Sequence, residues 1–315
     1  MPEDGDVARA LAAARARGAR WFHRLRSLAV VGFTDLLPAG RPRVQQLGPP
    51  CAYPVYFTCA ADFLSLRLSI LSLGQFAGRA VRRISVYQDC MHPLTDGERS
   101  ELAACSSYPI AYRTTPAPMT WGGITLLHNE LRAFLEMSRE LGPDDFIVKV
   151  DSDVLFTADW LFPKLLRVGA DLIGQPVSSL ATHTVHDVPD VQGGCYWLRA
   201  GAVFQLRSAS LFAAARAVVK RSRYDLWAVP EDRTISQWAH DAKLNVHLED
   251  YYLLDVARLR GRPFSSDPQI EACLSQETPF GVIHFERCKA GMAPCFEWLT
   301  RSGRASASAS MAIRS

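Results

Sequence analysis

The sequence predicts an α/β protein in which a mixed, mostly parallel β-sheet is flanked by helices. From residue 54 onward, short apolar runs of β-preferring residues alternate with longer segments of helical periodicity, and repeated strand–helix–strand units place parallel strands in one sheet. Hydrophobic residues make up 48% of the 315 residues and charged residues 21%, which is sufficient for one large core. We therefore expect a single folded domain over residues 49–300.

Each expected element has a local cause in the sequence. Strands are predicted where apolar and β-branched residues run together, and helices where apolar residues recur every three or four positions. Gly142 and Pro143 end the long helix predicted over 124–141, because neither residue continues a helix well. The expected strands are 55–59, 84–88, 110–113 and 146–150, and the expected helices are 62–76 and 124–141.

The two ends of the chain differ in composition from the domain between them. Residues 1–48 combine an Ala- and Arg-rich stretch, helical by pattern over 8–30, with a Pro-rich linker. The arginine-rich helix could contact a membrane surface or an acidic partner, or its charged face could be solvated. Residues 301–315 are rich in Ser and Ala, and we expect this tail to be disordered.

Charge and hydropathy exclude several classes of protein. The net charge is only +3, which is too small for a general nucleic-acid-binding protein, so we expect no nucleic-acid partner. There is no apolar stretch of about 18 residues, so no transmembrane helix is expected. The apolar run near the N-terminus is too short for a signal peptide, and we expect a cytoplasmic protein.

The strand predicted over 146–150 runs directly into Asp151, Ser152 and Asp153. In open α/β sheets, ligands bind beyond the carboxyl ends of the strands. Two carboxylates two residues apart can hold Mn²⁺ or Mg²⁺, which prefer oxygen ligands, although a solvated turn is the alternative reading. Lys149 points to the same face of the strand as Asp151, and it could orient the aspartates or form a structural ion pair.

Three later motifs add chemistry to this pair of aspartates. Gly193 and Gly194 stand before a predicted aromatic strand, where glycines let the backbone approach a ligand, or simply form a turn. Glu231 and Asp232 precede a helix predicted over 234–241. One of these carboxylates could act as a general base toward an acceptor hydroxyl, or both could simply be stabilised by the dipole at the start of the helix. His284 lies at the end of an apolar strand, where it could be a metal ligand or a buried core residue.

In this order, the motifs resemble those of the GT-A fold glycosyltransferases, over about residues 52–298. That family has a Rossmann-like sheet, an Asp-x-Asp motif, a Gly-rich loop, an x-Glu-Asp motif and a C-terminal histidine. The matching segments here are Asp151-Ser152-Asp153, Gln192-Gly193-Gly194, Pro230-Glu231-Asp232 and His284. The segment from Tyr56 to Asp62 is similar to the first strand of the family, and Asp89 is similarly placed after the second.

The resemblance implies a role for each site residue. Asp151, Asp153 and His284 would bind Mn²⁺ or Mg²⁺, and Asp232 would act as the catalytic base, with Glu231 beside it. The implied donor-binding residues are Thr58, Ala60, Asp62, Asp89, Asp151, Ser152, Gly193, Gly194 and Lys289.

Two features disagree about the subfamily and the stereochemistry. The run from Lys149 to Val154 is similar to that of β1,3-galactosyltransferases and Fringe, which invert the anomeric centre. The segment from His284 to Lys289 is similar to glycogenin-like enzymes, which retain it. We therefore assign no subfamily.

The expected function is metal-dependent sugar transfer from a nucleotide-diphosphate sugar, expected to be a UDP-sugar, with inversion. The acceptor could be a glycan, a natural product or a protein, and residues 175–191 are the expected acceptor loop. A retaining transferase and an inactive nucleotide-sugar-binding scaffold are the alternatives. A nucleotidyltransferase fits less well, because Cys59 to Asp62 lack its Gly- and Arg/Lys-rich loop.

Overall fold

The computed structural model of the chain describes residues 45–46, 48–119, 123–176, 191–206, 208–221, 228–254, 280–285 and 289–301. Three predictions lie wholly or almost wholly outside these residues. They are the basic helical arm with its linker, the acceptor loop beyond Pro176 and the tail after Arg301.

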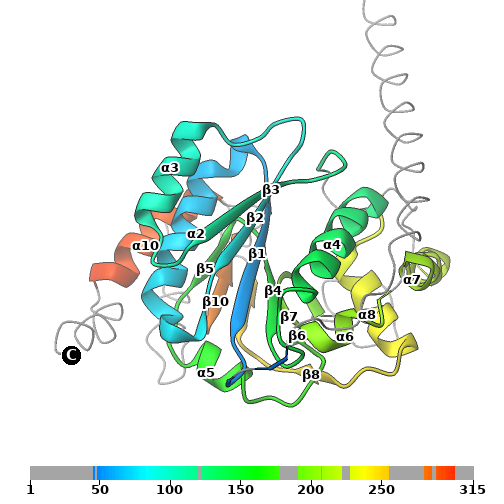
Figure 1. Cartoon of the computed structure of the whole chain (residues 1–315). Helices are drawn as coiled ribbons and strands as arrows, with labels where there is room; N and C mark the ends of the chain where they lie inside the picture. Colours follow the sequence, from blue (N-terminus) through cyan, green and yellow to red (C-terminus); the bar gives the residue numbers. More distant parts are fainter. Residues whose placement is uncertain are drawn as a thin grey trace, which may run out of the picture.

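A seven-stranded mixed sheet forms the centre of the molecule, which confirms the expected fold class. Its strand order is β3-β2-β1-β4-β7-β6-β8 (Figure 1). The strands β3, β2, β1 and β4 are parallel, β7 is antiparallel to both of its neighbours, and β8 is parallel to β6. Their bounds are β1 Ala52–Thr58, β2 Ile84–Gln88, β3 Ile110–Thr114, β4 Phe146–Val150, β6 Leu172–Pro176, β7 Val191–Arg199 and β8 Val246–Leu248.

Helices cover both faces of this sheet (Figure 1). One side carries α2 Phe63–Phe76, α3 Asp96–Cys105 and α10 Met292–Arg301, and the other carries α4 Gly123–Ser138, α6 Ala200–Val203, α7 Ser208–Arg221 and α8 Glu231–Asp241. The short helices are η2 Ala60–Asp62, η3 Gly78–Ala80, α5 Leu161–Leu165 and η7 Lys289–Gly291. Within the described ranges, no helix combines the length and the apolar character that crossing a membrane requires.

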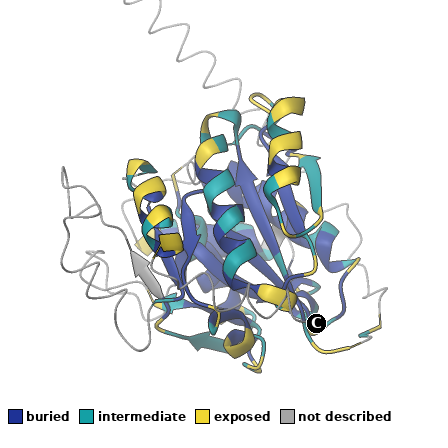
Figure 2. Ribbon diagram, turned by 90° about the vertical axis from the view of Figure 1, so that its left-hand side faces the viewer, coloured by how far each residue is buried: buried dark blue, intermediate teal, exposed yellow. Residues whose placement is uncertain are grey.

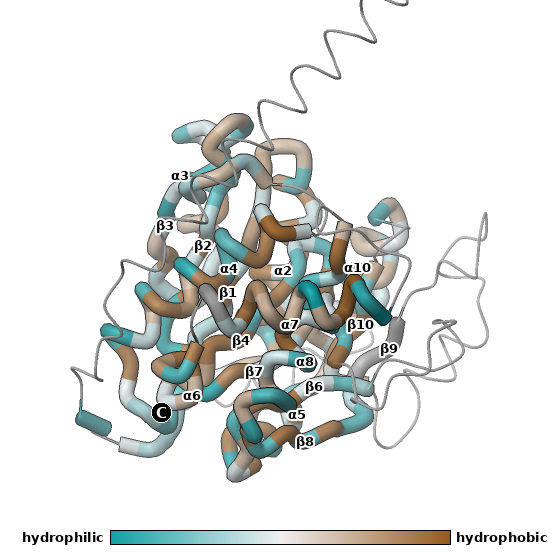
Figure 3. The backbone as a smooth tube through the Cα atoms, turned by 90° about the vertical axis from the view of Figure 1, so that its right-hand side faces the viewer, coloured by the Kyte–Doolittle hydropathy of each residue, from teal (hydrophilic) through white to brown (hydrophobic). Residues whose placement is uncertain are grey.

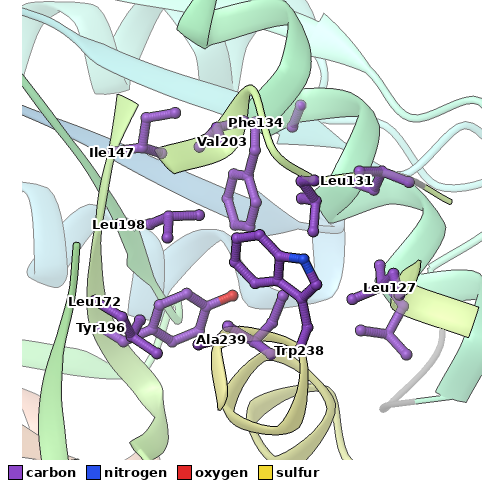
Figure 4. Close-up of a cluster of buried hydrophobic side chains, with 14 of the residues drawn as sticks. Leu127, Leu131, Phe134, Ile147, Leu172, Tyr196, Leu198, Val203, Trp238 and Ala239 are labelled. Carbon is purple, nitrogen blue, oxygen red and sulfur yellow. The ribbon is translucent and has the colours of Figure 1, made fainter. Parts of the chain in front are cut away.

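Two apolar cores lie on the two faces of the sheet, and a third, smaller cluster contains Met292, Cys295 and Leu299 of α10. Phe146 and Trp197 belong to the core on the α2 side. Phe134, Tyr196 and Trp238 belong to the core on the side of α4 and α8, where they lie together in Figure 4. Buried residues run through the central strands, and the exposed residues of the helices lie on their outer faces (Figure 2). Hydrophobic and hydrophilic stretches alternate along the helices, as the packing of amphipathic helices on a sheet requires (Figure 3).

A second, three-stranded sheet lies beside α2 and α10. It consists of β5 Val154–Phe156, β10 Val282–His284 and β9 Tyr252–Leu254 in the order β5-β10-β9. β10 is antiparallel to β5, and its residue His284 is the register partner of Val154. This pairing places a C-terminal strand directly beside the segment that follows β4.

Several predicted boundaries need correction. The glycine pair lies inside β7 and not before it, because the pairing with β4 continues past Val150, where the N–H of Asp151 donates to the carbonyl of Gly194 at 2.9 Å. Helix α8 begins at Glu231, three residues earlier than expected, because the N–H of Thr234 donates to the carbonyl of Pro230. Helix α4 ends at Ser138, before the expected end at residue 141.

Candidate functional site

The Asp-x-Asp segment lies at the carboxyl end of β4, between the two sheets. The N–H of Asp151 bonds to Gly194 of β7, and the N–H of Phe285 donates to the carbonyl of Asp153 at 2.8 Å. Ser152 between the two aspartates is buried. Because both flanking strands hold its backbone, the segment presents its two carboxylates in fixed positions.

Asp151, Asp153 and His284 form one group of potential metal ligands. One ligand atom from each residue lies within 4.8 Å of the other two. His284 Nε2 lies 3.1 Å from Asp153 Oδ1 and 3.8 Å from Asp151 Oδ2. The Asp153 and His284 side chains are 4% and 7% exposed, whereas that of Asp151 is 33% exposed, so a ligand can reach the group from the side of Asp151.

The charge state of Asp153 follows from its neighbours. Burial alone would raise the pKa of this carboxyl, but the hydrogen bond with His284 and the nearby charges of His284 and Lys289 lower it below its ordinary value. Asp153 is therefore ionised at neutral pH. A carboxylate oxygen and an imidazole nitrogen are both ligands that Mn²⁺ can bind.

Lys289 extends the site toward the N-terminal end of α2. Its Nζ donates to Asp62 Oδ1 and lies 3.7 Å from Asp153 Oδ2. Burial alone would lower the pKa of Lys289, but the hydrogen bond with Asp62 and the charge of Asp153 raise it, so the ammonium stays charged. Two residues implied as donor-binding, Asp62 and Lys289, therefore contact each other and one of them reaches the metal-ligand group.

Lys149 of β4 contacts Asp151 and links β4 to β7 and α8. Its buried Nζ is 2.7 Å from Asp151 Oδ1, 2.6 Å from the carbonyl oxygen of Gly193 and 3.5 Å from Glu231 Oε1. Burial on its own would lower the pKa of Lys149, but the carboxylates of Asp151, Glu231 and Glu130 raise it, so Lys149 is a buried cation. Lys149 does point to the same face as Asp151, as the strand period predicts.

Gly193 provides the space in which the acids of α8 approach β7. A Cβ atom at this position would lie 2.9 Å from Glu231 Oε1 and 3.2 Å from Asp232 Oδ2. Asp232 Oδ1 also accepts the N–H of Arg233 at 2.7 Å. Both acids are partly exposed. The first turn of α8 therefore places two carboxylates against the strand that also anchors Asp151.

The other residues implied as donor-binding gather at the carboxyl ends of β1 and β2. The N–H of Asp89 donates to the carbonyl of Thr58 at 2.8 Å, and the N–H of Ala60 donates to His92. Asp89 Oδ1 accepts the N–H groups of Met91, at 3.2 Å, and Met119, at 3.1 Å. These contacts hold the loops after the two strands together at the same edge of the sheet as Asp151.

Sequence reasoning missed one charged residue of the site. Glu130 of α4 is fully buried, and its Oε1 lies 4.0 Å from Lys149 Nζ. The signal was present, because Glu130 occupies the apolar face of its helix, three residues after Leu127 and one before Leu131. A charged residue on an apolar face indicates a partner in the core.

Comparison with known proteins adds the fold family. No family model and no curated protein matches the sequence. Among solved structures, the chain is similar to the galactosyltransferase LgtC in complex with donor and acceptor sugar analogs, with 14% identity, a TM-score of 0.53, and coverage of 79% of this chain and 95% of LgtC. The bifunctional WbbM glycosyltransferase matches with 13% identity and a TM-score of 0.50, over 77% of this chain and 47% of that one.

This chain has the GT-A fold. At 13–14% identity, this structural likeness shows the fold alone, so the activity has to be argued from the site. Within the GT-A fold of this chain, the four sequence motifs meet where β4, β7, α8 and β10 come together.

Proposed function

We propose that this chain is a metal-dependent glycosyltransferase that moves a sugar from a nucleotide-diphosphate sugar, with UDP-sugars as the expected class, to an acceptor hydroxyl. The observation that carries the proposal is the convergence of distant chemical groups on the Asp-x-Asp segment. His284 is 131 positions from Asp153 along the chain and contacts it directly. The GT-A fold supports the same reading, and residues 49–300 are its proposed catalytic domain.

The residues present fit a divalent cation. Asp151, Asp153 and His284 offer two carboxylates and an imidazole from two strands that the fold holds together. When bound, Mn²⁺ or Mg²⁺ would neutralise the diphosphate of the donor and stabilise it as a leaving group. Lys289, whose ammonium already lies beside Asp153, would meet a donor phosphate as a point charge.

The carboxylates of α8 supply the base in this proposal. Glu231 lies 3.5 Å from the buried ammonium of Lys149, which also contacts Asp151, so the Glu231 carboxylate balances the charge of Lys149. Asp232 follows it in the first turn of the helix. Asp232 takes the proton of the acceptor hydroxyl as the hydroxyl oxygen bonds to the anomeric carbon, while the bond to the diphosphate breaks on the opposite side and the configuration inverts. A general base contributes about 10²–10⁴-fold to such a step.

A thermal-shift screen of nucleotide sugars with Mn²⁺ tests the proposal. A donor at a hundred times its Kd stabilises the fold by about 2.7 kcal/mol, so the true donor class should raise the Tm measurably in the presence of Mn²⁺. Asp153→Asn removes one charged ligand at constant size, and it should abolish the metal-dependent shift and the activity while the protein stays folded.

The matched control is Asp159→Asn, which changes an exposed aspartate just beyond β5 and should behave as the wild type. Full activity of the wild type after EDTA treatment would contradict the metal-dependent reading. Metal-dependent binding of a nucleotide sugar without release of the nucleoside diphosphate, across a panel of acceptors, would instead indicate an inactive binding scaffold.

A further inference from the structure

Glu130 is a buried carboxyl group that the proposed mechanism does not use. It lies in the middle of α4 with a side chain that is not exposed at all. Its helix face is apolar, because Leu127, Leu131 and Phe134 belong to the core that also holds Tyr196, and the Phe134 ring lies beside that of Tyr196 in Figure 4. A carboxyl group buried among apolar side chains costs free energy unless polar partners compensate it.

Glu130 has two polar contacts, and both lead toward the site. Its Oε2 accepts a hydrogen bond from the Tyr196 hydroxyl at 3.4 Å. Its Oε1 is 4.0 Å from Lys149 Nζ and has no hydrogen-bond partner among the described residues. Burial raises the pKa of Glu130 well above its ordinary value, and Lys149 opposes this shift.

The ammonium of Lys149 has three protons to share among its neighbours. Its two short contacts are with the Gly193 carbonyl at 2.6 Å and Asp151 Oδ1 at 2.7 Å. Two oxygens lie further away, Glu231 Oε1 at 3.5 Å and Glu130 Oε1 at 4.0 Å. Glu130 therefore offers Lys149 an oxygen on the α4 side, in addition to that of Glu231 of α8.

We propose that Glu130 is a positioning residue, which holds the Lys149 ammonium in place between Asp151 and Glu231. The inference rests on the proposed function, because it gives Asp151 a role in binding the metal. Lys149 Nζ is already at hydrogen-bond distance from Asp151 Oδ1, at 2.7 Å, so loss of the Glu130 oxygens would change the sharing of its charge and not this distance. With one acceptor fewer, the ammonium neutralises more of the Asp151 carboxylate, which leaves less negative charge for a cation and weakens metal binding.

Titration with Mn²⁺ alone tests the inference, with the Tm of each variant measured alongside. Glu130→Met fills the same space without polar atoms, and it should weaken Mn²⁺ binding by about 10-fold or more, as loss of residues behind metal ligands does. Glu130→Gln keeps an oxygen for Lys149 and a polar partner for Tyr196, and it should restore most of the affinity.

Glu136→Gln makes the same change on the partly exposed part of α4, where Glu136 pairs with Arg132, and it should bind Mn²⁺ as the wild type does. If Glu130→Met fails to fold, Tyr196→Phe replaces it. This variant keeps the ring but removes the hydroxyl that holds Glu130 Oε2, so Glu130 Oε1 is no longer fixed near Lys149 and Mn²⁺ binding should weaken as well.

The results separate failure of this inference from failure of the proposed function. Wild-type Mn²⁺ affinity in Glu130→Met, or in Tyr196→Phe where that variant replaces it, overturns the positioning role whatever the Tm. A wild type that does not bind Mn²⁺, or binds it equally well after Asp153→Asn, overturns the metal site itself and the role of Glu130 with it. A loss of Tm without any change in Mn²⁺ affinity marks Glu130 as structural only.

Discussion

Replacing Gly193 by alanine would place a methyl group in the space that the acids of α8 occupy. The added Cβ atom would lie 2.9 Å from Glu231 Oε1, 3.2 Å from Asp232 Oδ2 and 3.3 Å from Asp232 Cβ. Contact without strain begins near 3.4 Å, so Glu231 must move by about 0.5 Å and Asp232 by about 0.2 Å. The backbone of Gly193 is not in the left-handed region, so alanine can adopt it.

The expected effect of Gly193→Ala is a loss of rate with little loss of stability. A misplacement of about 1 Å costs about 10²-fold in rate, so the shift of about 0.2 Å at the proposed base Asp232 predicts a loss of about 2–3-fold. Alanine gains about 0.4–1 kcal/mol by restricting the unfolded chain, which offsets part of the strain in the folded state.

The assay is release of the nucleoside diphosphate from the donor that the thermal-shift screen identifies. Gly169→Ala is the matched control, since a Cβ atom at Gly169 meets no other atom within 4 Å, and this variant should turn over at the wild-type rate. A folded Gly193→Ala variant with the full wild-type rate would refute the reasoning, because the position of the two carboxylates would then not matter for catalysis.

Three further predictions follow from the same geometry. Asp232→Asn should lower kcat by about 10²-fold or more and leave donor Kd nearly unchanged, whereas a residue that only caps α8 would tolerate asparagine; an NMR spectrum in which the product keeps the donor's anomeric configuration would rule out Asp232 as an in-line base. His284→Ala should weaken Mn²⁺ binding by about 10–100-fold or more with little change in Tm, whereas a merely structural His284 would show a stability loss of about 1–3 kcal/mol instead. Burial, and then the charge of Arg132, lowers the pKa of His128 from 6.5 to about 4, so the unfolded chain takes up a proton that the folded chain does not as the pH falls from 6.5 to 4. Protonation of His128 in the unfolded chain should therefore lower the free energy of unfolding by about 3 kcal/mol over this range. Urea titrations at the two pH values should show a smaller loss of unfolding free energy for His128→Gln than for the wild type. The exposed control His240→Gln should show the full wild-type loss.

The local elements of the fold follow from the sequence. The strands predicted over 84–88 and 146–150 have these same bounds in the structure, because an apolar, β-branched run and the polar residues that end it are both local features. The predicted helix over 62–76 differs from α2 by one residue. The position of the two aspartates at the end of a central strand follows for the same reason, since strand direction decides which end carries them.

The boundaries of β7 and α8 depend on more than local pattern. Two glycines in succession are typical of a turn, but β7 pairs with its neighbours on both sides of the glycines. It pairs with β4 up to Cys195 and with β6 at Tyr196 and again at Val191, and Asp151 donates to the carbonyl of Gly194. The close approach of Glu231 to Gly193 is likewise a contact between elements, which no local window of the sequence contains.

Only the tertiary structure decided which charged groups meet. Asp62 and Lys289 are 227 positions apart, Lys149 and Glu231 are 82 apart, and the strand that brings His284 to Asp153 belongs to a sheet that the sequence analysis did not predict. Local periodicity reports which face of an element is buried, but it carries no information about which element covers that face. Strand order and register supply that information, because the pairing that buries the most apolar surface and satisfies the backbone hydrogen bonds also determines which side chains share the space between the strands.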